Sequence, residues 1–107
     1  TARYIKRQGF KTVSLVAMGL DGVERTDEDE LCAEYLKALL TGENIKLESR
    51  IEKIKTTSGA KFFDVEKQSV FPKTDFYLCT DVDKFNFALL ISQNDESGEH
   101  TVEKVEI

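Results

Sequence analysis

Hydrophobic and polar residues follow two different patterns along the chain, and together they predict both strands and helices. Residues 12–18 form a nearly continuous apolar run rich in β-branched side chains, which is typical of a strand buried on both faces of a parallel sheet. Residues 85–92 and 101–107 instead alternate apolar and polar positions. These two segments predict an antiparallel hairpin at the end of the chain, with His100 at its tip.

Apolar residues recur at helical spacing between these predicted strands. Residues 26–40 give the clearest helix, with Thr26 as the expected N-cap and Gly42 as the residue that ends it. A second amphipathic helix is expected over residues 45–56. Shorter helical segments are expected at residues 2–8 before Gly9, at residues 60–66, and at residues 74–79 with Thr74 as the cap.

The order of these elements predicts an α/β fold. We expect a small, mostly parallel sheet that includes residues 12–18 and 85–92, with helices around it and an antiparallel hairpin at the C-terminus. The length of 107 residues fits a single domain over residues 1–107. The chain does not begin with Met, so we expect it to be part of something longer.

The charge of the chain limits its partners. It has 20 acidic and 15 basic residues, and the resulting net charge of −5 is opposite to what nucleic acids and anionic membranes attract. No apolar run approaches the ~18 residues that span a bilayer. Cys32 and Cys79 occur without a secretory signal, so we expect free thiols and a cytoplasmic protein.

Four consecutive acids, residues 27–30, open the clearest predicted helix. In one interpretation they only stabilise the helix dipole, by ~0.3–1 kcal/mol each. In the other they lie where open α/β sheets bind ligands, beyond the end of a strand and beside the loop of residues 19–22. Carboxylates there could hold Mg²⁺, and a phosphate would require that cation between itself and the acids. The pattern alone leaves both interpretations open.

Three further motifs have weaker chemical meaning. The pair Ser58-Gly59 could contact a phosphate, although such pairs more often only interrupt a helix. Residues 81–83 lack the flanking residues of a phosphatase nucleophile or a calcium loop, so we expect a solvated turn. Cys32 lacks the arginine that a cysteine phosphatase carries six residues later, and we expect it to be a core residue.

Several short segments, taken in order, resemble the 2-phosphosulfolactate phosphatase family. Residues 14–22 followed by residues 28–33 resemble that family's apolar strand, its G-x-x-G loop and its Glu-Asp-x-Leu-Cys-Ala helix start. Residues 58–62 and 74–85 resemble two later family segments. The resemblance covers roughly residues 2–92, and the end of the hairpin beyond Ser92 has no recognised counterpart.

The resemblance implies the C-terminal part of a longer, Mg²⁺-dependent phosphatase. Such enzymes hydrolyse 2-phosphosulfolactate to sulfolactate in the archaeal-type route to coenzyme M. The resemblance implies that Glu28 and Asp29 are the catalytic and metal-binding acids. It places four residues at the site of the small phosphorylated substrate: Gly19, Asp21, Gly22 and Ser58. Because the N-terminal half of the family is missing, we expect the isolated chain to be inactive.

A hypothesis from a different class competes with this one. The chain would be a non-catalytic α/β module that packs against a partner domain, or against a second copy as a homodimer. Exposed apolar surface is the feature to examine, because half of a divided protein should present the surface that its missing N-terminal domain covers. A self-sufficient domain should lack such a surface.

Overall fold

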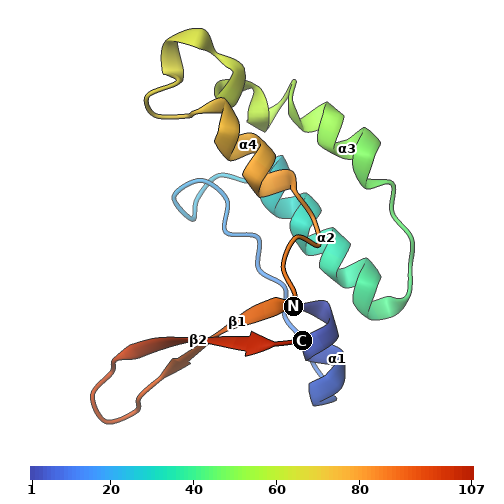
Figure 1. The fold of residues 1–107 in the computed structure, drawn as a ribbon, viewed down its shortest axis with the longest axis vertical. Coiled ribbons are helices and arrows are strands. Elements are labelled where there is room, and N and C mark those ends of the chain that lie inside the picture. Colours follow the sequence, from blue (N-terminus) through green and yellow to red (C-terminus); the bar gives the residue numbers. More distant parts are fainter. The chain divides into compact units, whose positions relative to one another are not determined.

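The computed structural model describes all 107 residues, which form helices and one small sheet, a mixed α/β composition (Figure 1). None of the helices combines the length and apolar character that crossing a membrane requires. The chain divides into two compact units, one of residues Val13–Val82 and one of Thr1–Thr12 with Asp83–Ile107. The elements in chain order are α1 (Ala2–Gln8), α2 (Asp27–Thr41), α3 (Leu47–Ile54), the 3₁₀ segments η1 (Ser58–Phe63) and η2 (Val65–Lys67), α4 (Lys73–Thr80), β1 (Phe87–Gln93) and β2 (His100–Glu106).

The larger unit has a small apolar core to which four elements contribute. Leu31 from α2, Ile54 from α3 and Phe76 from α4 are buried together. The ring of Phe63, from η1, meets the Phe76 ring edge-on with 5.1 Å between the centroids. Because each of these elements contributes a side chain to the same cluster, the core fixes α2, α3, η1 and α4 against one another.

The helices of this unit follow the hydrophobic pattern, and their ends follow backbone chemistry. The helix predicted over residues 26–40 is confirmed as α2, and Gly42 ends it with a left-handed φ of 81°. α3 is shorter than the predicted residues 45–56. Its last turn tightens, because the N–H groups of Thr56 and Thr57 bond to carbonyls only three residues back, at 3.1 Å each.

Two details beyond α3 differ from the prediction. The helix predicted over residues 60–66 is instead the pair of 3₁₀ segments, η1 and η2. The expected Thr74 cap of the last helix is wrong, because α4 begins one residue earlier, directly after the extended Pro72. The side chain of Gln68 accepts a hydrogen bond from the Lys73 N–H at 2.9 Å and so satisfies the first backbone donor of α4.

The smaller unit contains α1 and the predicted hairpin, both of which are confirmed. β1 and β2 pair antiparallel, from Phe87 opposite Glu106 to Gln93 opposite His100. α1 ends at Gly9, which has a left-handed φ of 68° as expected. The Arg7 guanidinium donates a 3.0 Å hydrogen bond to the Glu106 carbonyl, so the last turn of α1 contacts the end of β2.

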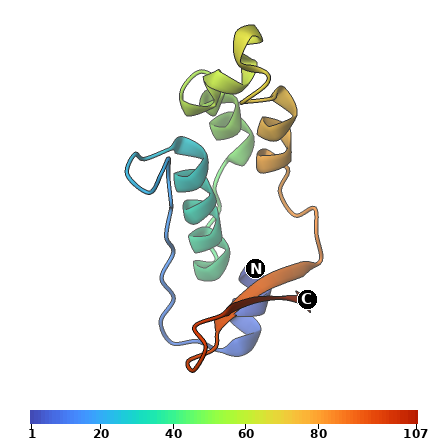
Figure 2. The same cartoon turned by 90° about the vertical axis from the view of Figure 1, so that its left-hand side faces the viewer.

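The mostly parallel sheet predicted from residues 12–18 and 85–92 is not present, because the only sheet is the antiparallel hairpin. Residues 13–18, here named the extended segment, follow an extended path beside α2 (Figure 2). They pair with no strand, and their peptide groups make no backbone hydrogen bond within the chain. The apolar pattern thus identified a strand-like conformation, but a strand becomes part of a sheet only when it has a neighbour.

Candidate functional site

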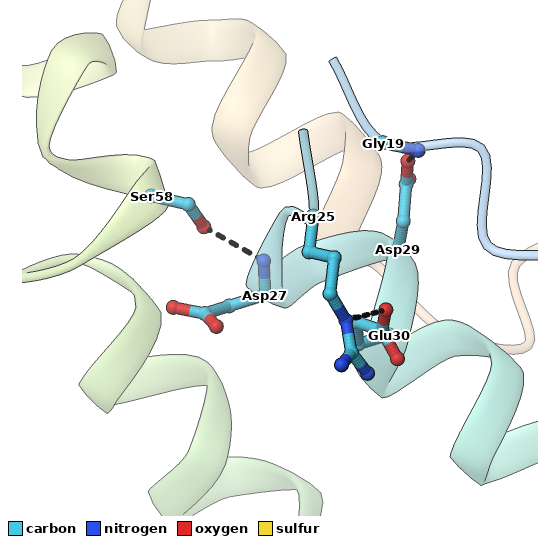
Figure 3. Close-up of polar contacts among 6 residues, drawn as sticks. All are labelled: Gly19, Arg25, Asp27, Asp29, Glu30 and Ser58. Atoms are coloured by element: carbon cyan, nitrogen blue, oxygen red, sulfur yellow. Dashed lines mark hydrogen bonds and ion pairs between the residues drawn. The ribbon is translucent and has the colours of Figure 1, made fainter. Parts of the chain in front are cut away.

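The first turn of α2 brings together residues from three distant parts of the sequence. The Gly19 N–H donates a 2.6 Å hydrogen bond to Asp29 Oδ2. The Ser58 hydroxyl accepts a 3.1 Å hydrogen bond from the Asp27 N–H and donates one of 2.6 Å to Glu28 Oε2. Figure 3 shows the bonds at Gly19 and at Asp27 on different sides of the helix. Four of the six predicted site residues, Gly19, Glu28, Asp29 and Ser58, therefore meet at this turn.

The two central acids nevertheless point to different partners. Adjacent helical residues do not face each other, because they project about 100° apart around the axis. Asp29 accordingly bonds to the loop that precedes α2, whereas Glu28 bonds to η1. Within this chain the two carboxylates anchor the start of α2 to two separate segments.

The loop of residues 19–24 folds back on itself. Leu20 and Glu24 form an isolated antiparallel bridge, in which the Leu20 N–H donates to the Glu24 carbonyl at 2.8 Å. Gly19 has a φ of +67°, and a Cβ there would lie 2.0 Å from the Glu24 carbonyl oxygen. The glycine-rich sequence of this loop thus matches its unusual backbone angles, and Gly19 is the residue that the bridge requires.

Asp21 and Gly22 lie at the exposed tip of the same loop. Both have positive φ, 54° at Asp21 and 69° at Gly22, so they form the reversal of the chain. Neither makes a hydrogen bond to Glu28, Asp29 or Ser58. The structure thus separates these two predicted site residues from the other four.

Ser58 and Gly59 have distinct structural roles. The pair does interrupt the helical path, since α3 has ended and η1 begins at Ser58. Gly59 is buried, and a Cβ there would lie 2.8 Å from the Ile54 carbonyl oxygen and 2.9 Å from the Phe76 ring. The absent side chain of Gly59 therefore allows η1 to approach the core, while the Ser58 hydroxyl reaches α2.

Thr26 differs from its predicted role. It precedes α2 in the extended conformation of an N-cap, yet its hydroxyl makes no cap hydrogen bond. The residue is only 8% exposed, and its Oγ1 is buried without a hydrogen-bond partner. The first N–H of the helix, that of Asp27, donates to the Ser58 hydroxyl. No local pattern indicates this, because Ser58 is 31 residues from Asp27 along the chain.

A polar cavity of about 440 Å³ lies beside the acid cluster, and the sequence patterns did not predict it. Arg25 Nε contacts Glu30 Oε1 at 2.8 Å, and Arg50 pairs with Glu34. The hydrogen bond from Arg25 lowers the pKa of Glu30, and that from Arg50 lowers the pKa of Glu34. The walls come from α2, α3 and their flanks: Arg25, Asp27, Glu30, Leu31, Glu34, Arg50, Lys53, Ile54 and Thr57. The basic residues are scattered in sequence, so only the packing of the helices reveals the cavity.

Both cysteines are free thiols, as expected, but Cys32 is exposed rather than part of the core. It borders two small cavities, of about 150 and 60 Å³, and is not a member of the core cluster. Cys79 also borders the smaller cavity, together with Glu28. Although Cys79 is exposed as a residue, partial burial of its thiol raises the pKa, and the carboxylates of Asp75 and then Glu28 raise it further.

The acids of this chain do not assemble a complete metal site by themselves. No group of three or more His, Cys, Asp or Glu side chains is arranged to hold a metal ion. Mg²⁺ demands a near-octahedral set of oxygen ligands, of which the protein commonly supplies one or two carboxylates. Glu28 and Asp29 diverge, so this chain offers individual carboxylates rather than a preformed pair.

Comparison with known proteins gives one informative match. No family model matches the chain, and no solved structure matches it. It is 33% identical, over 109 aligned positions, to the probable 2-phosphosulfolactate phosphatase of Bacillus subtilis (strain 168). The match covers 98% of this chain but only the C-terminal 45% of that relative, so the chain spans less than half of the relative's length. The resemblance predicted from the order of motifs is thus confirmed: the chain is similar to the C-terminal part of a 2-phosphosulfolactate phosphatase.

Proposed function

We propose that this chain forms the C-terminal part of a Mg²⁺-dependent phosphatase that hydrolyses 2-phosphosulfolactate. The meeting of Gly19, Glu28, Asp29 and Ser58 at the start of α2 is the observation that carries the proposal. These residues come from the segments whose order resembles the phosphatase family, and 33% identity to the Bacillus subtilis protein supports the same assignment. On this proposal the first turn of α2 faces the small phosphorylated substrate.

The proposal requires ligands from outside the 107 residues. The hydrogen bonds of Glu28 and Asp29 use only one oxygen of each carboxylate, Oε2 and Oδ2, so each acid retains a second oxygen for a cation. Because the two acids diverge, we expect one of them to complete a set that the N-terminal part of the protein supplies. The isolated chain is then expected to be inactive and to bind Mg²⁺ no better than scattered surface carboxylates do.

Calorimetric titration of Mg²⁺ tests this proposal directly. The complete protein is compared with its Glu28→Gln and Asp29→Asn variants, which remove charge but keep size and hydrogen-bonding oxygen. Asp27→Asn is the matched control, because it removes the same charge from the same helical turn but faces the polar cavity. We expect at least one of the first two substitutions to abolish Mg²⁺ binding and hydrolysis of 2-phosphosulfolactate, and Asp27→Asn to preserve both.

Two results would contradict the proposal. If both Glu28→Gln and Asp29→Asn keep their Mg²⁺ affinity and phosphatase activity, the two acids only anchor the start of α2. An equal loss in all three variants would indicate that the first turn needs negative charge for the helix dipole rather than at a defined site.

A non-catalytic interaction module remains the alternative proposal, and exposed apolar surface favours it. On the hairpin, Leu89, Ile91 and Val102 are each more than 60% exposed, and Ile91 lies directly opposite Val102 in the register. Such a face is typical of a surface that a partner or a second copy covers. A complete protein that uses this face for assembly, and lacks phosphatase activity in the assay above, would favour the module.

A further inference from the structure

The extended segment, residues 13–18, is a strand without a sheet. Its backbone N–H and C=O groups have no hydrogen-bond partner within the chain. The residues just beyond it differ in this respect, because Gly19 bonds to Asp29 and Leu20 bonds to Glu24. Six consecutive peptide groups therefore keep their hydrogen-bonding capacity open along both edges of the segment.

The side chains of the segment show the two-residue repeat of a β-strand. Residues 15–18 all border a cavity of about 150 Å³ together with residues of α2, including Leu36, but only Leu15 and Ala17 are partly buried. Val16 and Met18 are 74% and 67% exposed. This alternation is that of a strand with one face covered by a helix and one face open. Figure 2 shows α2 running alongside the segment.

The composition of the segment is unsuited to permanent exposure. None of residues 13–18 is charged or a proline, although such residues are what protects natural sheet edges from unwanted pairing. An uncharged segment with open peptide groups is instead a template on which another strand can pair. Since Val16 and Met18 make most of its outward face apolar, the occupant must cover that face in addition to bonding the edge.

We infer that the extended segment is an internal strand of a sheet whose neighbouring strands come from the N-terminal part of the complete protein. The matched relative carries more than half of its length before the region that this chain resembles, which is ample for such strands. A near-continuous apolar run is typical of a strand with both faces covered and both edges paired. A second copy related by two-fold symmetry would pair only one edge of the segment and leave the other open.

This inference rests on the proposed N-terminal partner but not on Mg²⁺ or on catalysis. Amide hydrogen exchange of residues 13–18 is compared between the 107-residue chain and the complete protein. The buffer contains EDTA, so that Mg²⁺ plays no part in the result. In the chain alone we expect rapid exchange at every concentration. In the complete protein we expect exchange on the order of 100-fold slower, while the amide of the exposed Asp95, in the hairpin turn, stays fast in both.

A pair of lysine substitutions in the complete protein locates the contact. Val16→Lys puts a charge on the outward face of the segment, whereas Val23→Lys puts the same charge on the neighbouring loop. Both side chains are largely exposed in the chain, 74% for Val16 and 85% for Val23, so neither change disturbs its own fold. We expect Val16→Lys to restore fast exchange in residues 13–18 and Val23→Lys to leave them protected.

Three outcomes would overturn the inference. The segment could exchange as rapidly in the complete protein as in the chain alone, or the reading frame could encode no strand-forming residues before Thr1. Alternatively, protection could rise with the concentration of the 107-residue chain, which would make a second copy the occupant. Protection in EDTA, combined with absent phosphatase activity in a separate assay that contains Mg²⁺, would refute the proposed function while leaving the strand assignment intact.

Discussion

At the scale of single residues, two glycines in one loop have the same backbone angle but different surroundings. Gly19 and Gly22 have φ values of +67° and +69°. A Cβ at Gly19 would lie 2.0 Å from the Glu24 carbonyl oxygen, whereas a Cβ at Gly22 would meet nothing within 4 Å. The pair therefore separates the cost of the left-handed conformation from the cost of a steric clash.

Gly19→Ala is expected to destabilise the larger unit more than Gly22→Ala does. The left-handed backbone alone should cost about 1–2 kcal/mol in either variant. Gly19→Ala must in addition break the Leu20–Glu24 bridge and weaken the hydrogen bond to Asp29. Urea denaturation monitored by circular dichroism measures both free energies of unfolding. Equal losses in the two variants would mean that the loop moves aside without cost.

Residue patterns predicted some of these roles and missed others for a physical reason. Positive φ at Gly19 follows from the glycine-rich loop, because only a residue without Cβ tolerates it easily. The N-cap role of Thr26 failed, because its hydroxyl is buried and makes no cap hydrogen bond. The contact of Ser58 with the Asp27 N–H was missed as well, since a separation of 31 residues hides it from any local rule.

At the scale of elements, the Ser58 hydroxyl connects η1 to the first turn of α2. It accepts a hydrogen bond from the Asp27 N–H and donates one to the Glu28 carboxylate, so a single side chain satisfies both a backbone donor and a charged acceptor. The core cluster joins the same two elements through apolar side chains. Polar and apolar contacts therefore hold η1 at α2 together.

Ser58→Ala is expected to lower the free energy of unfolding by about 1–2 kcal/mol, because a hydrogen bond to a charged group is lost together with a neutral one. Ser49→Ala is the control, since the Ser49 hydroxyl is exposed and makes only a 3.4 Å contact with the Lys46 carbonyl. Chemical denaturation of both variants gives the comparison. If Ser58→Ala costs no more than Ser49→Ala, the bond to Glu28 contributes nothing to stability.

Element prediction succeeded where the pattern is local and failed where it depends on partners. The helical repeat in α2 and the alternation in β1 each report the environment of a single element, so both were predicted with nearly correct bounds. The parallel sheet was predicted from the extended segment and β1, but the extended segment pairs with no strand and β1 pairs only with β2. Apolar patterning predicts that a strand will be covered, not which polypeptide covers it.

At the scale of the whole molecule, acidic residues outnumber basic ones. Two of the acids have a lower pKa in the folded state, and their ionisation therefore stabilises the fold. The chain carries a net charge of −5 at neutral pH. Arginine hydrogen bonds lower the pKa of Glu30 and of Glu34 in the folded state. A group whose pKa is lower when folded stabilises the fold above its unfolded pKa, and that contribution is lost as the pH falls through the folded pKa.

The stability of the chain is therefore expected to decline on acidification below about pH 4.3, the ordinary glutamate value. Glu34→Gln should lower the melting temperature slightly at pH 7 and should match the unmodified chain once the pH has fallen below the folded pKa of Glu34. Glu43→Gln, at an exposed position after α2, is the matched charge control. Thermal melts between pH 7 and pH 3 make the test. Parallel curves for Glu34→Gln and the unmodified chain would show that the Arg50 pair is energetically neutral.

The candidate site as a whole was only partly predictable. Four of its six predicted residues lie at the start of α2: Gly19, Glu28 and Asp29 are close to it in sequence, whereas Ser58 reaches it only through the packing of η1. Asp21 and Gly22 do not join them, since the chain reverses at these residues and projects them outward. The polar cavity beside Arg50 was missed, because its basic residues belong to elements whose packing no pattern specifies.

The two free cysteines give this chain a practical property. Cys32 belongs to α2 and Cys79 to α4, both are exposed, and the sequence contains no other cysteine. A pair of fluorescent or paramagnetic probes can therefore be attached to two core helices without introducing any substitution. Changes in the separation of those probes would report whether α2 and α4 move apart when the remainder of the protein docks.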